Sequence, residues 1–132
     1  MPEKHLKTLK EISTLSPNDT RLCFDLEADK DHLTNETLAL LATIVPDLEC
    51  LDINQEYTEE EKYSIDFSLH SFPKLTSLCT NCVPLTTLVL PEQNYPVLEA
   101  LDIQNTGPWD AARFSLRLPR LERLTLQFVH VI

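Results

Sequence analysis

The sequence predicts an α/β solenoid, a stack of short units whose strands lie side by side in one parallel sheet of about five strands. Two observations predict this fold class. Leucine accounts for 24 of the 132 residues, whereas there is a single glycine. A segment of the form P-x-L-x-x-L also recurs along the chain, and its prolines lie 27, 23 and 23 residues apart. Self-similarity at a period of roughly 20 to 29 residues is typical of stacked repeat units.

The clear copies of this segment are Pro46–Ile53, Pro73–Thr80, Pro96–Ile103 and Pro119–Leu126, and a degenerate copy covers Pro17–Leu26. In each copy the last residues form a short strand whose alternate side chains point inward. One unit cannot bury its leucines alone, so the units stack and their strands pair in parallel. We expect strands near residues 22–26, 50–54, 77–81, 100–104 and 123–127, with a ladder made by Leu51, Leu78, Leu101 and Leu124.

The stretch Leu33–Ile53, with its L-x-x-L-x-I ending, resembles the leucine-rich repeat superfamily. It is most similar to the ribonuclease-inhibitor-like or cysteine-containing class found behind F-box domains. The resemblance covers residues from about 17 to the end, and it implies a short horseshoe with helices on the convex side. Asparagines that hold the turns in this family are either missing here or shifted to Asn54, Asn81 and Asn105.

The convex segments differ from unit to unit. Leu38, Leu41 and Val45 have helical spacing behind Thr34, a good N-cap residue, so we predict a helix over about 35–45. The segment 82–91 contains two prolines and several β-branched residues. It should be extended or irregular, because an internal proline costs a helix about 3 kcal/mol. The segment 108–116 returns to a helix-like composition, with its proline in the tolerated first turn.

The two ends of the stack are predicted to differ. Leu6, Leu9, Ile12 and Leu15 alternate with lysines, which predicts an amphipathic capping helix over residues 3–15. We therefore divide the chain into an N-terminal cap, 1–16, and the repeats, 17–132. The last unit is truncated or uncapped, because its strand from Leu124 is apolar on both faces with no helix after it. Either the protein continues, or a second copy covers this edge and makes a homodimer.

Side chains beside the inward leucines should face the concave side of the sheet, where solenoids of this type bind partners. The candidate partner-binding residues are Arg21, Cys23, Asp25, Cys50, Asp52, Asn54, Ser77, Cys79, Asn81, Asp102, Gln104, Arg123, Thr125 and Gln127. They are small and polar, and acidic toward the N-terminal end. The alternative interpretation is a solvated strand face that binds nothing.

The cysteines Cys23, Cys50, Cys79 and Cys82 suggest a metal site, because the last two have the C-x-x-C spacing of zinc ligands. However, Cys79 should face the concave side whereas Cys82 already lies in the turn, so the four thiols should not converge. We predict no metal, and thiols that fill small positions in an intracellular protein. Disulfides are not expected either, because the sequence shows no export signal.

Enzyme chemistry is not indicated. With Gly107 as its one glycine, the chain cannot build a glycine-rich phosphate loop, and we predict no cofactor. The four histidines fall in different units; a dyad of Cys79 with His70 is the pairing that the sequence leaves open. We predict no catalytic residues and no enzyme.

Charge and hydropathy restrict the partners. Residues 1–66 carry 16 acidic and 6 basic side chains, and residues 67–132 carry five of each. This acidic chain is a poor match for nucleic acid, which is bound through lysine and arginine. No stretch of about 18 apolar residues and no secretory leader are present, so we expect no membrane partner and a cytoplasmic location.

Together these patterns predict a non-enzymatic protein–protein interaction module that binds a protein partner on its concave face. The alternative is the substrate-recognition fragment of a ubiquitin-ligase adaptor or of a microbial effector, with the activity outside these residues. Because one fold serves many functions, the choice between them depends on the family resemblance.

Overall fold

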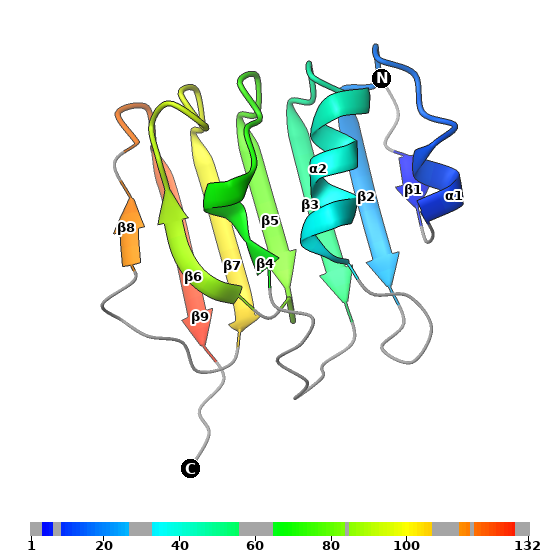
Figure 1. Cartoon of the computed structure of the whole chain (residues 1–132). Coiled ribbons are helices and arrows are strands. Elements are labelled where there is room, and N and C mark those ends of the chain that lie inside the picture. Colours follow the sequence, from blue (N-terminus) through cyan, green and yellow to red (C-terminus); the bar gives the residue numbers. More distant parts are fainter. Residues whose placement is uncertain are drawn as a thin grey trace.

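The computed structural model describes residues 4–6, 9–26, 33–55, 65–83, 85–106, 114–116 and 118–128, which form an α/β fold in two layers (Figure 1). The first layer, the main sheet, is parallel and is not closed into a barrel. Its strands follow the order β1-β2-β3-β5-β7-β9. They are β1 (Lys4–Leu6), β2 (Arg21–Leu26), β3 (Cys50–Gln55), β5 (Ser77–Asn81), β7 (Ala100–Thr106) and β9 (Arg123–Phe128).

The second layer covers one face of the main sheet (Figure 1). It consists of helix α2 (Asn35–Ile44), the short 3-10 helix η2 (Phe67–Leu69) and the strands β4 (Ile65–Asp66), β6 (Leu85–Leu90) and β8 (Phe114–Leu116). These three strands pair in parallel, in the order β4-β6-β8. Helix α1 (Leu9–Ile12) lies beside the first strands of the main sheet.

The predicted strands and the leucine ladder are confirmed. Equivalent positions of successive strands are paired in register: Leu22, Leu51, Leu78, Leu101 and Leu124. The first four of these leucines are at most 1% exposed, whereas Leu124 on the outermost strand is 46% exposed. A second buried row runs parallel to it through Phe24, Ile53, Thr80 and Ile103. The core therefore lies between the main sheet and the second layer.

The turns that lead into the strands repeat one hydrogen-bond pattern. The carbonyl oxygen of Glu49 accepts the backbone N–H groups of Thr76 (2.8 Å) and Ser77 (3.1 Å) from the next unit. The carbonyl oxygens of Thr20, Thr76 and Glu99 each accept two consecutive N–H groups in the same way. This shared acceptor satisfies backbone donors that a tight turn would otherwise bury without a partner, and it aligns each strand with the one before it.

Helix α2 confirms the helix predicted over about 35–45. Thr34 is its N-cap, and the hydroxyl oxygen accepts the backbone N–H of Thr37 at 3.1 Å. Leu38 and Leu41 are buried against the core. The segment predicted to be extended contains strand β6, as its prolines and β-branched residues indicated.

Two predicted helices are wrong where the structure describes them. Residues 4–6 form strand β1, paired in register with Leu22–Phe24, and the helix that follows has only four residues. The cap is therefore a further strand, because edge pairing satisfies the backbone of β2 directly, which a helix could not do. In the segment 108–116, residues 114–116 form strand β8, which pairs with Leu88–Leu90; residues 108–113 lie outside the described part of the chain.

Among the described residues, no helix is both long enough and apolar enough to cross a membrane.

Candidate functional site

The main sheet has one face turned away from the second layer, and we call it the open face. All of the sequence-predicted partner-binding residues lie on it, because burial alternates along each strand: in β2, for example, Leu22, Phe24 and Leu26 are buried while the residues between them are not. The predicted residues are half-buried on β3, β5 and β7, apart from the exposed Asn54, and exposed on β9. The alternation of side chains along a strand was sufficient to place them.

The open face is organised in three rows that cross the strands. The register gives a first row of Arg21, Cys50, Ser77, Ala100 and Arg123. The second row is Cys23, Asp52, Cys79, Asp102 and Thr125. The third row is Asp25, Asn54, Asn81, Gln104 and Gln127. Neighbours within a row lie about 4.8 Å apart along the hydrogen-bonding direction, so these rows form a continuous polar surface.

The second and third rows line an open hollow of about 370 Å³. Its lining consists of Cys23, Asp25, Asp52, Asn54, Cys79, Asn81 and Gln104. The hollow therefore spans four strands, β2, β3, β5 and β7, and the described residues that line it include two carboxylates and no cationic side chain.

Cys79 lies at the centre of the second row, between Asp52 on β3 and Asp102 on β7. Burial raises the pKa of this thiol to about 12, and both carboxylates and a hydrogen bond to Asp52 add to the rise. The thiol is therefore fully protonated at neutral pH. This protonation disfavours Cys79 as a nucleophile, because the thiolate is the reactive form.

Amide side chains are held in place along the third row. The Nδ2 group of Asn81 donates to Oδ1 of Asn54 at 2.8 Å, across the β3–β5 boundary. The Nε2 group of Gln104 donates to both carboxylate oxygens of Asp102 at 3.0 Å. Asn54 and Asn81 are thus joined side chain to side chain on the open face, while the side chain of Asn105 lies outside the described set.

Cys82 follows the last residue of β5 in a left-handed conformation, with φ of 62°. Its backbone N–H donates to the carbonyl oxygen of Gln104 at 3.0 Å, which holds the chain in this otherwise unfavourable region. Cys82 is thus separated from the open-face position of Cys79. In the described part of the chain, no three histidine, cysteine or acidic side chains are grouped so that they could hold a metal ion.

The second layer contains a polar network that sequence reasoning missed. Oδ1 of Asn35, at the start of α2, accepts the backbone N–H of Asp66 at 3.0 Å and lies 3.1 Å from Nε2 of His70. The amide of Asn94 donates to the carbonyl oxygens of Ser68 (3.0 Å) and His70 (3.1 Å). The network joins three consecutive units, and the only signal for it in the sequence was the polar character of residues between the repeats.

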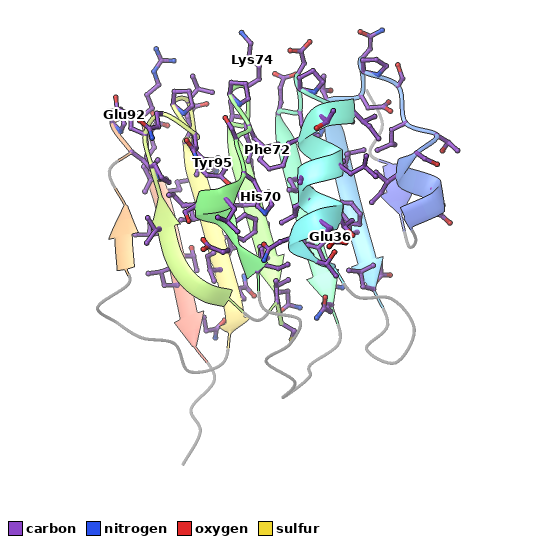
Figure 2. The ribbon with its side chains drawn as sticks, viewed as in Figure 1. Glu36, His70, Phe72, Lys74, Glu92 and Tyr95 are labelled. Atoms are coloured by element: carbon purple, nitrogen blue, oxygen red, sulfur yellow. The ribbon has the colours of Figure 1, made fainter. Side chains whose placement is uncertain are left out.

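His70 is 5% exposed, and burial lowers the pKa of its imidazole, with a smaller opposing effect of Asp66. Figure 2 shows His70, Phe72 and Tyr95 around η2, in the second layer. Because Cys79 lies on the open face, the main sheet separates it from His70. The Cys79–His70 dyad that the sequence left open is therefore not formed.

Two further buried polar groups went unnoticed in the sequence. Gln55 is 3% exposed, and within the described part of the chain its amide oxygen and nitrogen have no hydrogen-bond partner; the hydroxyl of Thr80, 0% exposed, has none there either. The register pairs Gln55 with Leu26, and Thr80 with Ile53. The place of Thr80 in the repeat could have marked it, since the other units have Phe24, Ile53, Ile103 and Leu126 there.

Comparison with protein-family models, with curated proteins and with solved structures finds no match to this chain.

Proposed function

We propose that the chain is a leucine-rich-repeat solenoid that binds a protein partner through the open face and catalyses no reaction. One observation carries the proposal: every predicted partner-binding residue lies on one polar face of the main sheet, opposite the second layer. The repeated carbonyl acceptors and the leucine ladder support the solenoid assignment, because they give successive units the same local geometry.

The composition of the open face supports binding to a protein. Apart from Ala100, Arg21 and Arg123, the side chains of its three rows are amides, hydroxyls, thiols and carboxylates, many of them half-buried, and such a surface offers hydrogen-bond donors and acceptors at a fixed spacing. The rigid strands that carry them limit the conformational entropy that binding would cost.

Photocrosslinking tests this proposal. A benzophenone amino acid replaces Asn54 or Gln127 on the open face, or Ala39 or Thr43 on the exposed side of α2; all four positions are exposed. After irradiation in an extract of the source cells, the open-face variants should give adducts of one defined size, and the α2 variants should not. Adducts that form equally from both sets, or only from α2, would refute the assignment of the open face as the binding surface.

A further inference from the structure

The open-face hollow has a chemistry that specifies one kind of occupant. Asp25 and Asp52 line it directly, and Asp102 stands next to Cys79 in the second row. On the described strands β2, β3, β5, β7 and β9 the cations of this face are Arg21 and Arg123, both in the first row. On β1 the register places His5 beside Cys23 in the second row. The rows that form the hollow therefore carry negative charge, and the positive charge lies at the opposite ends of the strands.

The surroundings of Cys79 indicate which charge the hollow favours. Burial is the main reason that the pKa of this thiol rises to about 12, and burial disfavours a charge of either sign. The carboxylates of Asp52 and Asp102 add to the rise because they repel a thiolate, and the same carboxylates would attract a cation.

The amides around the hollow fit a donor-rich group. The third row presents Asn54, Asn81 and Gln104 beside the carboxylates. A guanidinium group carries five N–H donors in a planar fork, which matches carboxylate and amide oxygens better than an ammonium group does. The hollow, at about 370 Å³, is near the lower limit of the roughly 300 to 1,000 Å³ typical of ligand sites. This size suits one long side chain.

We propose that the partner of the open face is a basic protein segment that places an arginine in the hollow between Asp25 and Asp52, within reach of Asp102. The proposal depends on the proposed function, which it extends by naming the chemistry of the partner. The segment crosses the strands along the second and third rows, so that its other basic residues stay away from Arg21 and Arg123.

Short peptides test the proposal without knowledge of the natural partner. The probe is a peptide of alternating glycine and arginine with blocked ends, and the controls are the same peptide with lysine or with glutamate in place of arginine. Binding to the full chain is followed by backbone amide shifts in NMR spectra at about 0.15 M salt, where long-range attraction is screened beyond about 8 Å. The arginine peptide should bind best, and the shifted amides should belong to β2, β3, β5 and β7.

Matched variants separate the hollow from the overall acidity of the chain, whose formal charge is −10. Both variants remove three negative charges and keep the side-chain shapes. The test variant combines Asp25→Asn, Asp52→Asn and Asp102→Asn, and the control variant combines Asp47→Asn, Glu92→Gln and Glu99→Gln at exposed positions in the turns. Thermal unfolding and the amide spectrum of each variant establish that it is folded.

The test variant should weaken binding of the arginine peptide by about tenfold, and the control variant by less than about twofold. Equal losses in the two variants would mean attraction to net charge alone and would overturn the proposal. So would equal binding of the glutamate peptide, or no binding of the arginine peptide. If the arginine peptide fails while crosslinks from Asn54 persist, the basic partner is refuted and the open-face binding function stands.

Discussion

Replacing Leu101 by alanine tests the stacked core most directly. Leu101 is 1% exposed and lies between Leu78 and Leu124 in the ladder, on strand β7. The substitution removes three carbon atoms, which at about 0.8 kcal/mol each amounts to about 2.4 kcal/mol of lost transfer free energy. The cavity left between β5 and β9 adds to this, so the total should fall at about 3 to 4 kcal/mol, within the range measured for buried leucines.

Leu124 provides the matched comparison, because the same substitution is made one strand further along the same ladder. With 46% of its surface exposed, it has given up only about half of its contact with water, and no closed cavity can form beside it. Leu124→Ala should therefore cost about 1 kcal/mol. Glu92→Ala, at an exposed turn position, should stay within about 0.5 kcal/mol of the unmodified chain.

Urea unfolding followed by circular dichroism measures all three variants. With a slope of about 1 to 3 kcal/mol per M, the midpoint of Leu101→Ala should fall below that of Leu124→Ala by about 1 M or more. Equal midpoints for the two leucine variants would mean that the ladder is not packed as the register requires, and the burial argument would be refuted.

Three more predictions concern other parts of the molecule. Because the pKa of His70 is lowered in the folded state, the unfolded chain binds more protons below about pH 6.5, so stability should fall as the pH drops through 6.5 toward the folded pKa. Urea midpoints compared at about pH 7.5 and 5.5 should show a smaller fall for His70→Gln than for the unmodified chain. An equal fall in the two proteins would contradict this prediction. Tyr95→Phe removes the 2.6 Å hydrogen bond from the tyrosine hydroxyl to the carbonyl oxygen of Phe67, but that oxygen still accepts the backbone N–H of His70 and is not left unpaired. Calorimetry should therefore show a loss of about 1 kcal/mol in the free energy of unfolding, and no loss would contradict the prediction. The edge strand β9, with its exposed Leu124, should cause self-association at about 100 μM in sedimentation experiments; Leu124→Lys should give a monomer, and an unmodified chain that is already monomeric would refute this.

The sequence was sufficient for the main sheet because the motif that contains each strand keeps the same internal spacing, although the distance between copies varies. Each P-x-L-x-x-L copy places one leucine in the ladder, and a shift of one residue would turn every apolar side chain to the wrong face. The open face followed from the same register, so Asp52, Cys79 and Asp102 could be placed side by side before the structure was known.

The second layer was harder to predict because its segments differ in length and composition. Local propensity identified α2, with its cap at Thr34, but favoured helix at residues 4–6 and 114–116, where strands form. In both cases pairing with a neighbouring strand outweighs helix propensity, which is a weak preference that tertiary context overrides. The hydrogen bonds of Asn35 with Asp66 and His70 span 31 and 35 residues, so no local pattern could reveal them.

The strand register also explains why the carboxylates of the open face do not destabilise the sheet. In the second row Asp52 and Asp102 do not occupy adjacent strands, because Cys79 on β5 stands between them. Two strand spacings separate them by about 9.5 Å, whereas like charges directly opposite each other would destabilise the sheet. Asp25 is offset from Asp52 by one row and one strand. A cation that enters the hollow can therefore be attracted by all three carboxylates, while the folded chain pays little for their mutual repulsion in its absence.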